Sequence, residues 1–331
     1  KNILSKVYKY HMKILAIQNR MGIGDTIIFL PFIKALSKKY NSPISLLVKE
    51  NSKADQYLHQ TNYIDEIINL ERDNKNNKKH NGFTGVFNLI KDLKKYNFDK
   101  IFIFNSSLRY NLIARFSKIP EIYQYPLFNK TNQHITNLPK KFLKEKLNLD
   151  VYGDPEIQIN DSLLPQTINK FQIDKNKLNI LLGIGGSGPT KRIPAKTFLN
   201  VIDRILKEKK CKFFLATGKD SEEQLILNEI LNSKFKNVCH RLDDLTIKET
   251  LPIIKCCNLA ICNDSSFSHL SSALGIKTIT LMADTPLIYG SYNSKMFPII
   301  PDGEITVGHN TLGKEKINPE KIFNKIIEII N

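Results

Sequence analysis

Apolar, strand-like runs alternate with amphipathic, helix-like segments from residue 13 onward, and this alternation restricts the chain to few folds. In the first half, strands are predicted at 13–17, 44–48, 64–68 and 100–104, and helices at 26–39, after Ser52, at 86–95 and at 110–117. Short strands alternating with helices are typical of a parallel sheet flanked by helices. The polar stretch 71–82 interrupts the pattern and is predicted as a mobile surface loop.

A second series of the same kind begins at residue 178. Its predicted strands are 178–184, 212–217, 237–240, 258–262 and 278–282, and its predicted helices are 195–209, 222–231, 247–254, 267–274 and 319–330. Residues 152–165 show no period and include Gly153, Pro155 and Pro165, which predicts a linker. A length of 331 residues also suits two domains. We therefore predict two doubly wound α/β domains, at 12–160 and 166–331, with ligands at the carboxyl ends of the strands.

The stretch GIGGSGPTKRIP, from Gly183 to Pro194, follows the first strand of the second series and contains the spacing G-x-G-x-x-G. A dinucleotide fingerprint needs such glycines to lead directly into a helix, but Pro189 and Pro194 delay the helix. Asp203, the acid about 20 positions further on, lies inside the predicted helix and not at the end of the next strand. A phosphate-binding P-loop also fits poorly, because it needs a lysine where Pro189 stands.

What remains is a glycine-rich turn at a strand end, with the hydroxyls of Ser187 and Thr190 and the cations of Lys191 and Arg192. Backbone N–H groups, hydroxyls and a cation are the groups that a diphosphate requires, above all when it departs as a leaving group. The alternative is a flexible loop with solvated charges.

Asp25 stands at the start of a predicted helix, after the first strand, Gly22 and Gly24. One interpretation is an N-cap, whose carboxylate satisfies free N–H groups. The other is a general base, because a helix N-terminus favours the ionised carboxylate that could accept a proton at neutral pH.

A polar cluster follows the strand at 258–262 and consists of Asp264, Ser265, Ser266 and His269. Capping explains one of the three residues at the helix start, but not all of them. A lone histidine is more often a hydrogen-bonded structural residue than a catalyst, so we expect His269 to orient this turn.

Three acids, Asp220, Glu222 and Glu223, begin the helix after the strand at 212–217. Most such acids are solvated charges of a first helical turn. Glu222 could instead accept hydrogen bonds from ribose hydroxyls at this edge of the sheet.

A net charge of +17 favours an anionic partner, such as a phosphorylated glycolipid or a membrane surface. The alternative is that the charge only reflects the high lysine content of the whole chain and has no functional role. No basic stretch is interleaved with aromatic residues, so we expect no nucleic-acid partner.

No apolar run reaches the roughly 18 residues of a membrane span. Residues 1–11 lack the apolar core of a secretory signal, and we expect Met12 to be the natural start. The five cysteines show no zinc-binding spacing, and we expect reduced core residues of a cytosolic protein: Cys211, Cys239, Cys256, Cys257 and Cys262.

Three of these stretches together resemble glycosyltransferase family 9, the heptosyltransferase-like enzymes of lipopolysaccharide-core synthesis, and the likeness extends from Met12 over nearly the whole chain. The opening pattern is similar at Gly24, Asp25, Leu30 and Pro31. The loop expected to bind the donor is similar at Ser187, Thr190, Lys191 and Pro194. The third signature is similar at Asp264, Ser265, Ser266, His269, Leu270 and Ala273.

The chain departs from the family pattern at two places. Ser266 stands where the family usually has glycine, which could crowd the sugar pocket. A later Gly-Pro-Thr stretch of the family is replaced by Ala283, Asp284, Thr285 and Pro286. Both departures bear on which donor is used.

The resemblance implies a GT-B fold of two Rossmann-like domains that face each other across a cleft, an N-terminal acceptor-binding domain and a C-terminal nucleotide-sugar-binding domain. It implies an inverting transfer without a metal or cofactor, from a nucleotide-diphosphate sugar, typically ADP-heptose, to a lipopolysaccharide-core or related glycan. On this basis Asp25 is the base and Lys191 neutralises the diphosphate. The residues implied in donor binding are Gly186, Ser187, Thr190, Lys191, Glu222, Asp264, Ser265, Ser266 and His269.

Gly24 and Arg109 are the candidates for contact with the acceptor, and a surface charge is the alternative for Arg109. An anionic glycolipid acceptor would suit a cytoplasmic enzyme that is peripheral to the inner membrane.

Two other classes of function stay open at this point. One is a nicotinamide-dependent oxidoreductase that uses Gly183–Gly188. A helix starting at Gly185 and a sheet of strand order 3-2-1-4-5-6 would support this alternative. The other is a non-catalytic protein that binds a nucleotide sugar or a polyanion.

Overall fold

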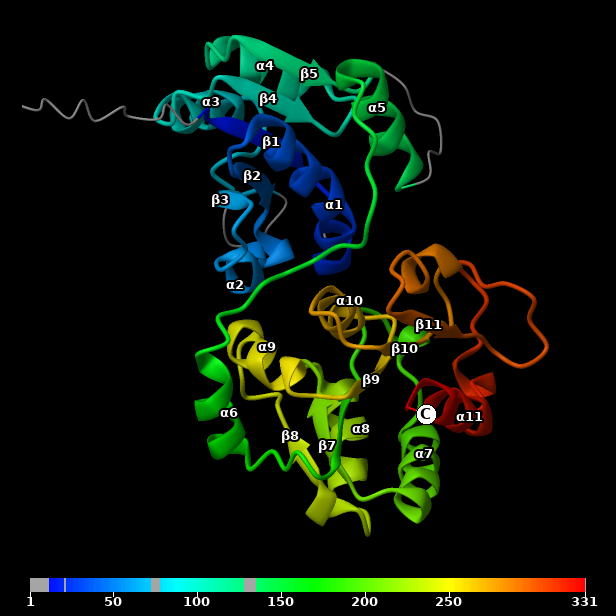
Figure 1. Ribbon diagram of the computed structural model, residues 1–331. Coiled ribbons are helices and arrows are strands. Elements are labelled where there is room, and N and C mark those ends of the chain that lie inside the picture. Colours follow the sequence, from blue (N-terminus) through cyan, green and yellow to red (C-terminus); the bar gives the residue numbers. More distant parts are fainter. Residues whose placement is uncertain (1–11, 21, 73–77, 128–134, 331) are drawn as a thin grey trace, which may run out of the picture. The chain divides into compact units, whose positions relative to one another are not determined.

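The structure is a computed structural model that describes residues 12–20, 22–72, 78–127 and 135–330 (Figure 1). The expectations for residues 1–11, and for the middle of the predicted loop at 73–77, lie outside the described residues. Two compact units are distinguished by their internal contacts, and the second extends from Gly153 onward. The segments Gly22–Ile28 and Gln56–Gln60 group with this second unit, whereas the other described residues before Gly153 form the first.

The first unit is built on a parallel five-stranded sheet of order β3-β2-β1-β4-β5. The strands are β1 (Ile14–Gln18), β2 (Ile44–Lys49), β3 (Ile64–Leu70), β4 (Lys100–Ile103) and β5 (Glu121–Gln124). The helices in this part of the chain are α1 (Ile23–Tyr40), α2 (Ala54–Leu58), α3 (Thr84–Lys94), α4 (Leu108–Phe116) and α5 (Asn137–Leu147).

Helices cover both faces of this sheet. On one face, Leu89 of α3 and Ile113 of α4 belong to the same apolar cluster as Leu15 and Ile17 of β1. On the other face, Phe29 of α1 and Phe142 of α5 pack against Phe104, with ring centroids 5.5 and 5.6 Å from that of Phe104. Because the central strands are buried on both sides, they have the continuous apolar sequences of a parallel sheet.

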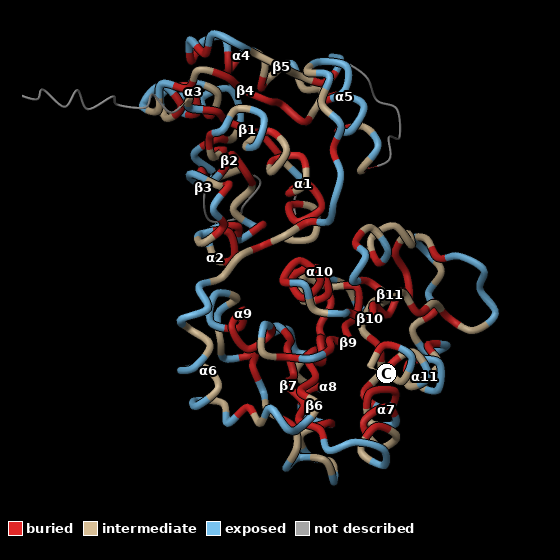
Figure 2. Tube along the Cα trace, viewed as in Figure 1, coloured by how far each residue is buried: buried red, intermediate tan, exposed pale blue. Residues whose placement is uncertain are grey.

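The second unit contains a parallel six-stranded sheet of order β11-β10-β9-β6-β7-β8. Its strands are β6 (Leu178–Gly183), β7 (Cys211–Ala216), β8 (Cys239–Arg241), β9 (Leu259–Asn263), β10 (Thr278–Leu281) and β11 (Met296–Ile299). Its helices are α6 (Leu163–Phe171), α7 (Ala195–Glu208), α8 (Ser221–Leu231), α9 (Ile247–Lys255), α10 (Ser266–Ala273) and α11 (Pro319–Ile330). The strands and the inner sides of α7 and α10 are buried (Figure 2).

The helix boundaries of this unit have local causes. Asp220 caps α8 by accepting a hydrogen bond from the Glu222 N–H. Thr246 and Glu249 form a reciprocal capping box at the start of α9. Pro194 is the N-cap residue of α7, which therefore begins only at Ala195.

The prediction of two parallel α/β sheets is confirmed, as are the predicted strands and helices within a few residues. Four elements were missed: β5, α5, α6 and β11. The strand β5 is a partly polar edge strand, β11 contains Pro298, and α6 lies at the end of the predicted linker. The interpretation of 71–82 as a mobile loop was wrong for its last part, because His80 is buried and lies 3.2 Å from the Asp92 carboxylate.

Substitution of a core side chain in the second unit tests this packing. Phe198 of α7 is 1% exposed, so Phe198→Ala should lower the free energy of unfolding by about 3–5 kcal/mol through lost burial and a residual cavity. The measurement is urea denaturation followed by circular dichroism. Leu225→Ala is the control, because Leu225 is 69% exposed and its loss should change stability by less than about 0.5 kcal/mol.

Candidate functional site

The glycine-rich loop starts at the carboxyl end of β6 and leads to α7. Within it, Pro189–Lys191 form a single 3-10 turn, and α7 begins at Ala195. When the strands β6 to β11 are numbered 1 to 6, the second sheet has the 3-2-1-4-5-6 order of dinucleotide-binding proteins. Strand order alone therefore does not separate a glycosyltransferase from a nicotinamide-dependent oxidoreductase. The glycines, however, lead into this 3-10 turn and not directly into an α-helix, so they do not place a diphosphate on the N-terminus of α7.

A buried carboxylate, that of Glu223, holds the first part of this loop. Its Oε1 accepts a hydrogen bond of 2.6 Å from the Gly186 N–H, so this amide already has an acceptor. A Cβ atom on Gly185 would lie 2.7 Å from the same oxygen, and one on Gly218 would also collide with the carboxylate. The two glycines therefore allow Glu223 to reach the backbone. The interpretation of Glu223 as a solvated charge of a first helical turn was wrong, although glycines after two neighbouring strands could have indicated a close approach.

Arg192 joins the loop to the start of α8. Its Nε donates to the Gly186 carbonyl at 3.0 Å, and its Nη1 lies 2.6 Å from Glu222 and 2.8 Å from Asp220. Glu222, predicted to bind ribose, is ion-paired with Arg192, and its side chain is more than half exposed.

An ion pair links the loop to the end of β9. The Nζ of Lys191 lies 2.8 Å from Oδ2 of Asp264, whose side chain is only 5% exposed. Burial acts to raise the pKa of Asp264, but the neighbouring His269 and Lys191 more than offset it, so the net pKa is below its usual value. The carboxylate stays charged at neutral pH, and it fixes the Lys191 ammonium at the carboxyl edge of the sheet.

His269 lies in the first half of α10, with its Nε2 3.8 Å from Asp264 and its Nδ1 2.7 Å from the Tyr292 hydroxyl. Its ring stacks on Tyr292 with centroids 5.6 Å apart. Burial lowers the pKa of His269, and the carboxylates of Asp264 and Asp25 oppose this shift only in part. A neutral, stacked and hydrogen-bonded imidazole is what the expected orienting role requires.

Asp25 and Gly24 lie in the first turn of α1, which groups with the second unit. The Asp25 carboxylate accepts a hydrogen bond from the Gly22 N–H at 3.1 Å. Since α1 begins at Ile23, Asp25 is its third residue and reaches back like the acid of a capping box, and it is not the N-cap itself. A side chain on Gly24 would collide with the His269 imidazole.

The remaining candidates near the loop differ in their surroundings. Ser187 is exposed, and the Thr190 hydroxyl bonds to Asp284. Ser265 is the N-cap residue of α10, and its buried Oγ has no partner among the described residues. Ser266 is the first residue of α10 and is partly buried. A buried hydroxyl without a partner beside Asp264 is a group that a ligand could satisfy.

Asp284, one of the departures from the family pattern, anchors a neighbouring loop. Its carboxylate accepts a 2.9 Å hydrogen bond from the Leu312 N–H. Burial acts to raise the pKa of Asp284, but hydrogen bonds from Leu312 and Thr190 lower it by more. The departure therefore ties the glycine-rich loop to residues 310–312.

Arg109 belongs to the first unit, at the start of α4. Its two Nη atoms donate to the carbonyls of Gly82 and His80, both at 2.7 Å. The guanidinium thus holds α4 against the turn that precedes α3, and contact with an acceptor stays a prediction.

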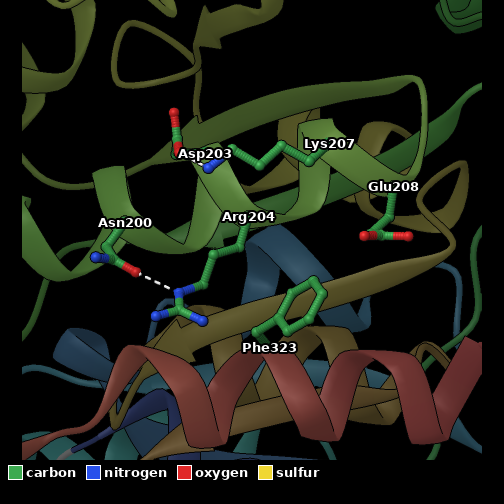
Figure 3. Close-up of a pocket in the computed structure, with 6 residues that line it drawn as sticks. All are labelled: Asn200, Asp203, Arg204, Lys207, Glu208 and Phe323. Atoms are coloured by element: carbon green, nitrogen blue, oxygen red, sulfur yellow. Dashed lines mark hydrogen bonds and ion pairs between the residues drawn. The ribbon is translucent and has the colours of Figure 1, made fainter.

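A hollow of about 400 Å³ lies between α7 and α11, on an outer side of the second unit (Figure 3). It includes Asp203, which is ion-paired with Lys207 and Lys234 at 2.8 Å each, and Arg204, whose Nε donates to Asn200. Its lining comes from the helices and not from the carboxyl ends of the strands, so it does not belong to the candidate site.

The sequence also led to expectations about metal ligands, cysteines and membrane-spanning helices. No cluster of three or more His, Cys, Asp or Glu side chains in the described part of the chain could hold a metal ion, and metal independence stays a prediction. All five cysteines are free thiols, four of them buried. None of the described helices is long and apolar enough to cross a bilayer.

Comparison with known proteins decides the family. The family model described as glycosyltransferase family 9 (heptosyltransferase) matches residues 130–300, just over half of the chain. The chain belongs to glycosyltransferase family 9. This family 9 chain is 28% identical over 258 residues to lipooligosaccharide heptosyltransferase 2 of Campylobacter jejuni, covering 74% of this chain and 77% of that protein.

It is also 27% identical over 166 residues to lipopolysaccharide heptosyltransferase 1 of Campylobacter coli, covering 47% of this chain and about half, 48%, of that protein. The crystal structure of a family 9 glycosyltransferase from Veillonella parvula superposes with a TM-score of 0.77 at 18% identity, covering 96% of this chain and 97% of that one. The expected glycosyltransferase enzyme with the two Rossmann-like domains of the GT-B class is confirmed. The oxidoreductase alternative is therefore wrong.

The role of Glu223 is tested by truncation. Glu223→Ala should lower the free energy of unfolding by about 1–3 kcal/mol, because the buried Gly186 N–H loses its acceptor. Glu223→Gln keeps a carbonyl acceptor and should have a smaller effect. Glu222→Ala, which removes an exposed ion pair, is the matched control and should change stability by less than about 1 kcal/mol. Equal midpoints of urea denaturation for Glu223→Ala and Glu222→Ala would contradict this role.

The environment of His269 predicts a pH dependence of stability. Burial lowers its pKa below the ordinary 6.5, so the unfolded chain binds a proton more readily than the folded one as the pH falls through 6.5. The free energy of unfolding should decrease from about pH 7 to about pH 5, and by less in His269→Gln. His309→Gln changes an exposed ring and should behave as the wild type. The measurement is a set of urea melts across this pH range, and an unaltered slope in His269→Gln would disprove the expectation.

Proposed function

We propose that this family 9 enzyme transfers a sugar, heptose from ADP-heptose, to a lipopolysaccharide-core or related glycan acceptor with inversion and without a metal. The observation that carries the proposal is the ion pair between Lys191 and the buried Asp264 at the carboxyl edge of the second sheet. A cation that is fixed at the end of a parallel sheet, beside a helix N-terminus, suits an anionic group of a ligand.

The diphosphate of the donor would bind between Lys191 and the start of α10. Lys191 carries three N–H donors, so it can keep its bond to Asp264 and still donate to a phosphate oxygen. The N-terminus of α10 adds a partial positive charge, and the unpartnered Ser265 hydroxyl adds a donor. Together these groups would stabilise the charge that develops on the diphosphate when its bond to the sugar breaks, a role that Mg²⁺ has in other enzymes.

The nucleoside would lie toward the start of α8. The Glu222 carboxylate, held by Arg192, retains lone pairs that ribose hydroxyls could bond. Ser187 and Thr190 of the loop complete the proposed donor contacts, and Ser266 faces the sugar.

Asp25 is the proposed general base. Its carboxylate lies in the first turn of α1 and accepts a hydrogen bond from the Gly22 N–H. In the proposed step it removes the proton from the acceptor hydroxyl, the hydroxyl oxygen bonds to the anomeric carbon, and the diphosphate leaves from the opposite face with the bonding electron pair. Charge and protons balance, because the proton remains on Asp25 until solvent removes it.

The names of the Campylobacter relatives support an acceptor from lipopolysaccharide or lipooligosaccharide. The net charge of +17 supports an anionic glycolipid and a place on the cytoplasmic face of the inner membrane.

Asp25→Asn separates catalysis from binding. Turnover should decrease by about 10²- to 10⁴-fold, because the amide cannot accept the proton. Donor binding should persist, so ADP-heptose at about 100 times its Kd should still stabilise the variant by about 2.7 kcal/mol in a thermal melt. Asp203→Asn, which neutralises a carboxylate outside the site, is the control and should keep wild-type turnover.

Three outcomes can be distinguished. Equal turnover in Asp25→Asn and the wild type would remove Asp25 from the mechanism. Donor binding without turnover in the wild type would contradict the proposed acceptor. Stabilisation by another nucleotide sugar, and not by ADP-heptose, would correct the donor.

A further inference from the structure

Five large apolar side chains are exposed on α3, α4 and the residue before α3. The exposed fractions are Phe83 78%, Phe87 58%, Leu108 41%, Leu112 40% and Phe116 61%. We call this set the α3–α4 face. Isolated exposed apolar residues are ordinary, but five on two neighbouring helices are a feature of surfaces that bind something apolar.

The spacing places these side chains in two stripes. Phe83 and Phe87 are four residues apart, and their rings contact edge-on with centroids 5.2 Å apart. Leu108, Leu112 and Phe116 follow each other at the same interval along α4. Residues four apart lie on one side of a helix, so α4 presents an apolar stripe to solvent and α3 begins with an exposed aromatic pair.

The two stripes belong to one surface. Both α3 and α4 pack on the same face of the first sheet, and they contact each other. Arg109 fastens their beginnings together through the carbonyls of His80 and Gly82. Phe83 follows Gly82 and Leu108 precedes Arg109, so the apolar stripes start side by side. Figure 2 shows exposed residues along the outer sides of both helices.

On the two helices themselves, cations outnumber acids. The exposed cations on and beside the two helices are Lys78, Lys79, Lys91, Lys94, Lys95, Arg115 and Lys118. Asp92 is the one acid in the sequence of either helix. It is half-buried and already paired with Lys79 at 2.5 Å and with Lys95 at 3.0 Å.

We infer that the α3–α4 face docks on the surface of an anionic lipid bilayer, with its phenylalanine side chains among the acyl chains and its lysines at the headgroups. Stable attachment to a membrane without a spanning helix usually takes two signals, an apolar one and a basic one, and this face supplies both. The excess of cations disfavours a second copy of the same face, because like charges would meet in such an isologous contact. The docking does not depend on the proposed reaction, although a lipid-linked acceptor would lie on the same surface.

The absence of tryptophan from the sequence allows a clean test. In Phe87→Trp, the emission of the single tryptophan should shift to the blue when vesicles of equal parts phosphatidylglycerol and phosphatidylcholine are added, and not with phosphatidylcholine alone. Ile305→Trp is the matched control, because Ile305 is 97% exposed in the second unit and its emission should not shift with either vesicle.

Charge reversal tests the basic component by co-sedimentation with the same vesicles. Lys91→Glu with Lys94→Glu should lower the partition coefficient at least about tenfold, because each lysine near the surface contributes to the attraction. Lys209→Glu with Lys210→Glu makes the same change of charge on the second unit and should lower it much less. Turnover on a water-soluble acceptor fragment and stabilisation by ADP-heptose should be unchanged in both variants, so failure of docking and failure of the proposed reaction remain distinguishable.

Three results would overturn the inference. The first is an unshifted Phe87→Trp spectrum with the anionic vesicles. The second is equal loss of binding in the two charge-reversal variants. The third is a blue shift that appears without lipid, rises with protein concentration and accompanies a doubled mass in light scattering, which would identify the face as a contact between copies.

Discussion

The buried carboxylate of Asp264 is the constraint on which the site depends. A charge with little exposure is tolerated only when other groups compensate for the lost water, and here the Lys191 ammonium does so. The lysine comes from the glycine-rich loop, and Asp264 follows β9. One ion pair therefore joins two segments that are far apart in the sequence, and it orients the cation that the proposed chemistry needs.

Two further acids extend this arrangement around the carboxyl edge of the second sheet. Glu223 binds the Gly186 amide, and Asp284 binds the Leu312 amide and the Thr190 hydroxyl. Loops of irregular backbone have N–H groups without partners in a helix or strand, so carboxylates on neighbouring elements satisfy them. The loop is held from both sides before any ligand binds, and an ordered loop loses less conformational entropy on binding.

The two faces of the first sheet differ in their surroundings. On the face covered by α1 and α5, aromatic rings pack closely around Phe104. On the other face, the inner sides of α3 and α4 are apolar, and their outer sides carry phenylalanine, leucine and lysine where solvent-facing helices usually carry mixed charges. The need to cover the sheet explains the inner sides only, and the apolar residues of the outer sides suit the proposed contact with a bilayer.

The sequence by itself determined the two parallel sheets and the three polar strand ends, because hydrophobic period and strand–helix order are local properties. The sequence also made the G-x-G-x-x-G pattern a poor fit for a dinucleotide site, since Pro189 and Pro194 delay the helix, but only the family match excluded the oxidoreductase alternative. Only the tertiary structure decided which of two adjacent acids is buried: Glu223 lies against Gly185 and Gly218, whereas Glu222 is exposed beside Arg192. It also decided that Arg109 binds backbone carbonyls and that Asp25 is the third residue of its helix. These outcomes depend on which strands are neighbours in the sheet and how deeply each loop is covered, and no local pattern of residues contains that information.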